Sequence, residues 1–143
     1  MFSARLAGEK IKLVETLKID VDALIGSNYK LPGITDTQAI LASTKALYWS
    51  IIDKQLGSLL GIIGTTQGLE SNQIFYKFKI NGIELYDAFE ESLRLVLDYL
   101  DYANLDGEYY IVIDSVPYGI KQSLKRNGFE FSDRAWRVNI SDK

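Results

Sequence analysis

The sequence contains no cysteine and no histidine among its 143 residues. These two absences exclude a thiol nucleophile, a Ser-His-Asp triad, a Cys/His zinc site and a neutral imidazole base. Any proton transfer must therefore use Asp, Glu, Tyr, Lys, water or the main chain. The lack of cysteine also agrees with a cytosolic protein, where disulfides are rare.

Long apolar runs are absent as well, because no stretch approaches the ~20 residues that a membrane-spanning helix needs. The opening MFSARLAGEK has no apolar segment of the length that a signal peptide requires. The formal charge of −3 provides no basic field for a phosphate backbone, and Lys and Arg are scattered along the chain. We therefore expect a cytoplasmic protein that binds neither nucleic acid nor a membrane.

What is present is typical of an ordinary globular protein. Hydrophobic residues make up 47% of the chain and charged residues 24%. The sequence contains no internal repeat, low-complexity tract or linker. We expect residues 1–143 to form a single domain with one core.

The clearest element is a helix predicted over residues 81–102. Asn81 and Glu84 have the spacing of a capping box, with Asn as the N-cap residue. Residues for one buried face recur at three- and four-residue steps, with mostly charged residues between them. They are Leu85, Ala88, Phe89, Ser92, Leu93, Val96 and Leu100.

Strands and shorter helices are predicted for the rest of the chain. We expect helices near 20–25, 36–46 and 118–128, and strands at 11–15, 48–53, 58–66, 73–80, 108–114, 129–131 and 135–139. Short turns join the second, third and fourth strands, which predicts an antiparallel meander. The strand, long helix and strand that follow predict a parallel crossover. The fold class is α/β (α+β), with a mixed, mostly antiparallel central sheet of six to seven strands flanked by helices.

The positions of three glycines indicate local backbone structure. Gly61 and Gly64 lie inside a predicted strand, where glycine indicates either a crowded sheet position or a close approach to a ligand. Gly128 follows the last predicted helix and is placed as a left-handed helix stop.

Four segments, taken in order, resemble the GNAT superfamily of N-acetyltransferases, with a start similar to the branch that acetylates ribosomal-protein N-termini. They are GEKIKLVE (8–15), SLLGIIG (58–64), FEESLRLVLDYL (89–100) and LKRNGFEF (124–131), the last similar to the family's helix that ends in a Gly-Phe pair. The resemblance covers residues 8–140. It implies acetyl-CoA as co-substrate, no metal, and an acceptor amine on a small molecule or a peptide N-terminus. A homodimer is a further expectation, because members of the family often dimerise.

The resemblance also assigns binding residues. In such proteins the fourth and fifth strands splay apart, the pantetheine arm lies between them, and the pyrophosphate sits on the amides that start the next helix. The assigned residues are Phe78, Lys79 and Ile80 for the arm, Asn81, Gly82 and Tyr86 within 81–87 for the pyrophosphate, and Tyr118 and Lys121 for the far wall.

Candidate catalytic residues are Tyr118, Tyr76 and Glu70. Either tyrosine could carry a proton to or from a substrate amine or the coenzyme thiolate, and Glu70 could deprotonate an amine. Each has a structural alternative, which is an aromatic side chain packed at an edge for the tyrosines and a turn carboxylate for Glu70.

The coenzyme-binding loop departs from the family pattern. Leu85 and Asp87 occupy the positions of its small residues, and the first turns of the helix carry four carboxylates that would repel a pyrophosphate. Pro117 and Leu124 replace the usual Asn and Tyr. Two functions therefore stay open: an N-acetyltransferase, or a non-catalytic relative that binds a peptide, a small ligand or another copy of itself.

Overall fold

The computed structural model describes residues 7–15, 46–66, 72–78, 82–103, 105–111 and 118–140. These residues form strands and helices close to the predicted positions. The strands are β1 (Ile11–Glu15), β2 (Ala46–Asp53), β3 (Leu59–Thr66), β4 (Asn72–Phe78), β5 (Gly107–Ile111), β6 (Glu130–Ser132) and β7 (Ala135–Ile140). The helices are α3 (Gly82–Tyr102) and α4 (Tyr118–Arg126).

Two predicted helices cannot be compared with this arrangement. The helix expected near 20–25 lies outside the described residues, and so does the one expected near 36–46 except for its last residue. Ala46 is the first residue of β2, so the prediction of helix at this position is wrong. Its alignment with Thr66 in the β2–β3 ladder decides its conformation.

The strands form one mixed sheet in the order β1-β2-β3-β4-β5-β7-β6. Neighbours from β1 to β4 are antiparallel, which confirms the predicted meander. Strands β4 and β5 are parallel, as the strand–helix–strand pattern predicts, and the remaining pairs are antiparallel. The sheet is therefore mostly antiparallel, with a single parallel junction among its described strands.

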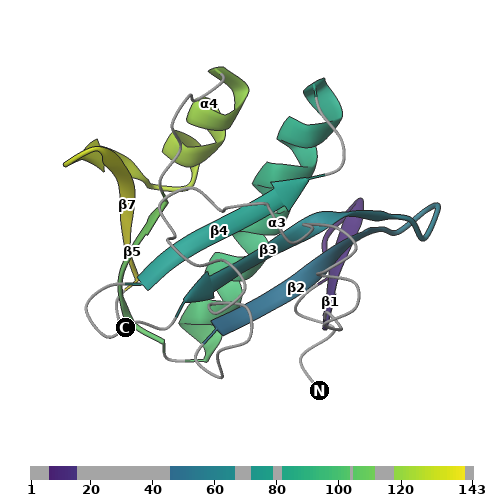
Figure 1. The fold of residues 1–143 in the computed structure, drawn as a ribbon, viewed down its shortest axis with the longest axis horizontal. Helices are drawn as coiled ribbons and strands as arrows, with labels where there is room; N and C mark the ends of the chain where they lie inside the picture. Colours follow the sequence, from purple (N-terminus) through teal and green to yellow (C-terminus); the bar gives the residue numbers. More distant parts are fainter. Residues whose placement is uncertain are drawn as a thin grey trace, which may run out of the picture.

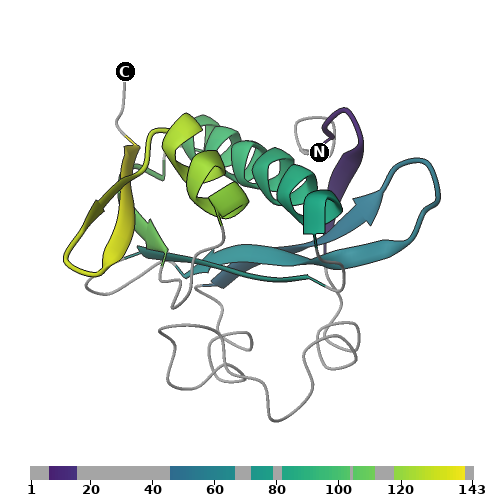
Figure 2. The same ribbon diagram turned by 90° about the horizontal axis from the view of Figure 1, so that it is seen from above.

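Helices α3 and α4 cover the same face of this sheet and contact each other, as Figure 2 shows. The face of α3 that was predicted to be buried packs onto the sheet, with Phe89, Leu93, Val96 and Leu100 fully covered. One hydrophobic cluster joins these side chains to residues of β1 to β5, α4 and β7. Since the cluster includes residues from both ends of the sheet, the two helices hold one shared core against it.

The alternation predicted for β4 is also present. Ile74, Tyr76 and Phe78 pack into the core beneath α3, whereas Phe75 is buried outside that cluster. Successive side chains of a strand point to opposite faces, so Phe75 lies on the other face of the sheet. Gly61 and Gly64 lie on the neighbouring strand, and an added Cβ would meet the backbone of Lys77 at the first and of Leu47 at the second. Both glycines are thus crowded sheet positions.

Helix α4 ends as the sequence predicts. Gly128 has φ of 87°, in the left-handed region that glycine adopts most cheaply. The Phe129 amide donates to the Leu124 carbonyl over 3.0 Å, and both side chains are buried. This six-residue closure with its apolar contact is a Schellman motif, which turns the chain from α4 into β6.

Candidate active site

The described parts of β4 and β5 pair over a short stretch, and β5 is described only as far as Ile111. In the described residues they pair at two positions, Asn72 with Tyr109 and Gln73 with Tyr110. Figure 1 shows β4 continuing toward the start of α3 while β5 runs in a different direction. The diverging directions of the two described strands agree with the splay that the resemblance implies between the fourth and fifth strands.

Glu90 links α3 to α4 through an ion pair. Its carboxylate accepts from Arg126 Nε over 2.9 Å and from Ser123 Oγ over 3.3 Å, and Arg94 approaches to 3.3 Å from one turn along α3. The hydrogen bond from Arg126 holds the pKa of Glu90 below its usual value, although partial burial opposes this shift. The same bond raises the pKa of the Arg126 guanidinium. The charge of Glu90 is therefore offset within the helix pair.

The other carboxylates at the start of α3 face β1 and the β2–β3 turn. Glu91 accepts from the Lys10 amide over 2.9 Å and from the Ile11 amide over 3.1 Å. Glu84 and Asp87 are exposed and line, with Glu91, a cavity of about 570 Å³ next to β1 and this turn. The acidic side chains that were expected to repel a pyrophosphate are thus paired or turned toward the side of α3 next to β1.

The first turns of the two helices meet at Tyr86 and Gly119. A Cβ added to Gly119 would lie 2.6 Å from Cγ of the Tyr86 ring, so only a glycine lets the ring lie this close to α4. Tyr86 also packs against the shared core. The residue that the resemblance assigns to the pyrophosphate therefore lies against α4.

Tyr76 and Phe78 form an aromatic cluster with Phe89 of α3. The Tyr76 ring centroid lies 4.9 Å from that of Phe89 and 5.8 Å from that of Phe78. The rings are tilted to each other, which is the favoured geometry for aromatic pairs. Tyr76, a candidate proton carrier, is half-buried in this cluster, and its catalytic role stays a prediction.

Several candidate residues fall on parts of the chain whose structure is not described. Glu70, Lys79, Ile80 and Asn81 lie outside the described residues. Gly82 begins α3 and Tyr118 begins α4, but nothing is described of the Tyr118 side chain. The capping box stays a prediction as well, because its N-cap residue Asn81 lies outside the described residues. The roles assigned to these residues stay predictions.

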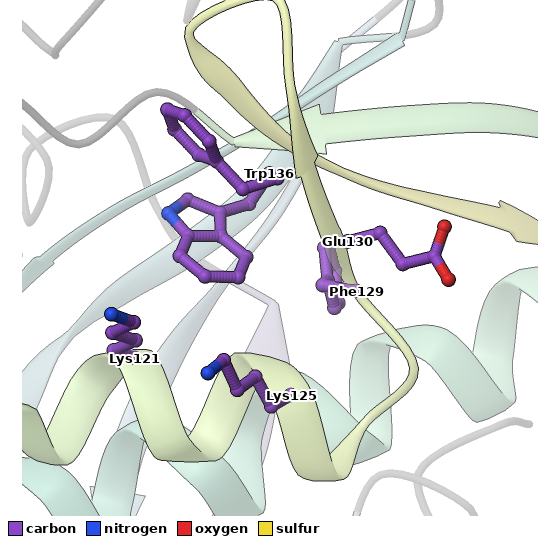
Figure 3. Close-up of a pocket in the computed structure, with 6 residues that line it drawn as sticks. Lys121, Lys125, Phe129, Glu130 and Trp136 are labelled. Atoms are coloured by element: carbon purple, nitrogen blue, oxygen red, sulfur yellow. The ribbon is translucent and has the colours of Figure 1, made fainter.

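Lys121 projects from α4 toward strands β6 and β7, as Figure 3 shows. It lines a cavity of about 680 Å³ with Lys125, Phe129, Glu130, Phe131 and Trp136. Neither Phe131 nor Trp136 is among the site residues that the sequence predicts. A two-residue turn at 133–134 could have predicted that these two residues lie together, because such a turn places Phe131 opposite Trp136.

The described residues contain neither an acidic metal-binding cluster nor a membrane-spanning helix. No group of three or more acidic side chains that could hold a metal ion occurs in the described ranges. No helix there has both the length and the apolar character needed to cross a membrane.

Comparisons with known proteins bear on the fold. No protein-family model matches the chain, and no curated protein sequence matches it. A proposed acetyltransferase from Sphaerobacter thermophilus superposes with a TM-score of 0.69 at 11% identity, over 94% of this chain and 96% of that one. The ribosomal-protein-S18-alanine N-acetyltransferase from Escherichia coli gives a TM-score of 0.66 at 10% identity, over 93% and 96% of the two chains.

A third structure carries the family name. An acetyltransferase of the GNAT family from Staphylococcus aureus gives a TM-score of 0.61 at 16% identity, over 92% of this chain and 99% of that one. The chain therefore has the GNAT fold along nearly its whole length. At these identities the likeness is one of fold.

Proposed function

We propose that the protein is an N-acetyltransferase that takes its acetyl group from acetyl-CoA and transfers it to an amine on a small molecule or a peptide N-terminus. The observation that carries the proposal is the splay of β4 and β5 within a GNAT fold. Two parallel strands that run in diverging directions leave room for an extended chain such as the pantetheine arm, which their main-chain groups can bind. A cytoplasmic location and a homodimer belong to the same proposal.

The charges around α3 support coenzyme binding. A pyrophosphate is stabilised at a helix N-terminus by the free amides and the helix dipole. Glu90 is paired with Arg126, and Glu91 accepts from the Lys10 and Ile11 amides at the start of β1. The repulsion that remains comes mainly from Glu84 and Asp87, which lie on the side of α3 next to β1.

The proposed reaction is acyl transfer between a thioester and an amine. The amine nitrogen forms a bond to the acetyl carbon, the carbon–sulfur bond breaks, the amine loses a proton and the departing thiolate gains one. Main-chain amides of β4 would stabilise the oxygen of the thioester carbonyl. Tyr118 and Tyr76 remain the candidate proton carriers, and Glu70 the candidate base.

A second function is favoured by one observation. Tyr86 lies on Gly119, where the ends of α3 and α4 meet, and the chain keeps no glycine at positions 85 and 87. A non-catalytic relative could keep this closed contact and bind a peptide, a small ligand or a second copy of the chain.

Calorimetric titration with acetyl-CoA, and with free CoA in parallel, separates the two functions. We expect saturable binding at micromolar concentrations, followed by release of free thiol when amine acceptors are added. Because the protein has no cysteine, a thiol reagent detects only the released coenzyme. Absence of binding at millimolar acetyl-CoA would favour the non-catalytic relative.

The variant Asp87→Asn tests the charge argument. Removing one carboxylate from the start of α3 should tighten acetyl-CoA binding about two- to fivefold, the size of a charge effect at a helix terminus. The matched control is Asp98→Asn, which removes an exposed carboxylate three turns further along α3 and should leave the affinity unchanged. Equal effects of the two variants would show that only the net charge of the protein matters.

A further inference from the structure

Helix α4 separates two regions of different chemistry. Ser123 and Arg126 face α3 and bind Glu90. Lys121 and Lys125 are one helical turn apart and face strands β6 and β7, where they line the cavity of about 680 Å³. A volume of this size is within the range of small-molecule sites, roughly 300–1,000 Å³.

The cavity carries positive charge. Lys121 and Lys125 are exposed, and neither forms an ion pair with another described residue. Glu130 also borders the cavity, but its carboxylate extends away from the two lysines and from Trp136, as Figure 3 shows. Two ammonium groups thus point toward the same space, and no carboxylate of a described residue faces them there, which suits an anionic group on a ligand.

Two aromatic rings form the opposite wall. Phe131 and Trp136 are direct cross-strand neighbours, with ring centroids 5.3 Å apart. Trp136 is 6% exposed whereas Phe131 is 60% exposed, which is unusual for a large apolar side chain. The two ring planes are tilted by 59° to each other, so the exposed Phe131 ring offers an apolar face to a ligand and the largely buried Trp136 ring borders it.

A buried hydrogen-bond donor lies in the same wall. Trp136 Nε1 is buried and has no hydrogen-bond partner among the described residues. A buried indole N–H normally has an acceptor, because leaving it without one costs free energy. Trp136 lines the cavity, so a ligand bound there is a candidate acceptor for this donor.

We propose that the cavity between α4 and the β6–β7 hairpin binds a small aromatic carboxylate. The flat body of the ligand stacks on the exposed Phe131 ring beside Trp136, and its carboxylate binds the ammonium groups of Lys121 and Lys125. A carboxylate oxygen accepts from Trp136 Nε1. This site lies on the side of α4 away from α3. The resemblance assigns one of its residues, Lys121, to the coenzyme gap, and competition with acetyl-CoA tests whether the two sites are separate.

The two tryptophans provide the readout. We would label the full-length protein with ¹⁵N and titrate it with 2-naphthoate, following the indole N–H signals. The Trp136 signal should shift in a saturable way, while the signal of Trp49, which packs against Tyr99 in the core, should stay unchanged. The neutral analogue 2-naphthamide should bind at least about tenfold more weakly, because it loses the charge-assisted hydrogen bonds.

A double variant tests the role of the lysines. Lys121→Gln with Lys125→Gln should raise the dissociation constant of 2-naphthoate about tenfold or more. Both side chains are exposed, so the fold should persist, and the spectrum itself checks this. The matched control, Lys10→Gln with Lys12→Gln, makes the same charge change on the β1 side of the molecule and should leave the affinity unchanged.

Several results would overturn the proposal. They are an unshifted Trp136 signal at millimolar 2-naphthoate, equal shifts of both indoles, equal affinities for the acid and the amide, or displacement of the probe by inorganic phosphate alone. Displacement by acetyl-CoA would also overturn it, because the cavity would then belong to the coenzyme site. Failure of acetyl-CoA to bind at all would overturn only the proposed function.

Discussion

At the scale of single residues, Glu90 controls a pH-dependent link between the two helices. Its side chain is 18% exposed, whereas that of Arg126 is 56% exposed, so solvent partly screens the pair. We expect Glu90→Gln to lower the free energy of unfolding by roughly 0.5–1 kcal/mol at neutral pH. Glu108→Gln removes a carboxylate that pairs with Arg137 and is more exposed than Glu90, so it should lower the free energy of unfolding by less.

The amount by which Glu90→Gln lowers the free energy of unfolding should decrease as the solution becomes acidic. Because the folded-state pKa of Glu90 is lowered, its contribution is present above its unfolded pKa, about 4.3, and is lost as the pH falls through the folded value. Urea unfolding of wild type and variant at a series of pH values measures this. A difference that persists in strong acid would assign the effect to packing instead of charge.

The turn between β6 and β7 carries a second residue-scale feature. Asp133 and Arg134 have φ of 49° and 64°, which a two-residue turn of this hand requires but which side chains disfavour. Arg134→Gly should therefore raise the free energy of unfolding by about 0.5–1 kcal/mol. Arg134→Ala removes the same side chain but keeps the disfavoured φ, so in urea unfolding it should show no gain.

At the scale of elements, the contact of α3 with α4 depends on Gly119. An added methyl group would displace the Tyr86 ring, and overpacking of this kind costs about 1–3 kcal/mol. Gly119→Ala should therefore destabilise the wild type. In a Tyr86→Ala background the same change should stabilise by up to about 1 kcal/mol, because alanine favours a helix more than glycine does.

A double-mutant cycle in urea unfolding measures this coupling. Tyr86→Phe serves as the control background, because it keeps the ring and should respond to Gly119→Ala as the wild type does. If Gly119→Ala changed the free energy of unfolding in the same direction in the Tyr86→Ala and Tyr86→Phe backgrounds, the contact between the Tyr86 ring and α4 would be contradicted.

At the scale of the whole molecule, two halves of a sheet are joined by a narrow junction. Strands β1 to β4 and strands β5 to β7 meet at the two residue pairs of β4 with β5. The hydrophobic cluster under α3 nevertheless includes residues of both halves. We therefore expect the protein to unfold in a single cooperative transition, as a single domain does.

Each half contains one tryptophan, which makes this expectation measurable. Trp49 lies in β2 and Trp136 in β7. Fluorescence of Trp49→Phe and Trp136→Phe variants reports the two halves separately, and both should unfold at the same urea concentration once each variant is referred to its own circular dichroism curve. Separate midpoints within one variant would show that the halves behave as independent units.

Local patterns in the sequence determined the elements and their faces. The spacing of Phe89, Leu93 and Val96 is enough to predict which side of α3 is buried, because 3.6 residues complete a helical turn. Gly128 predicts a helix stop, because glycine takes a left-handed conformation most cheaply. The order of strands and helices led to the fold, since short connections leave few topologies.

Only the tertiary structure decided where distant side chains meet. The sequence places four carboxylates at the start of α3 but does not show that Glu90 pairs with Arg126 or that Glu91 binds amides of β1. Likewise, neither the contact of Tyr86 with Gly119 nor the cavity of Lys121 and Trp136 is visible in a local pattern. Such contacts depend on the packing of whole elements, which short-range spacing does not specify.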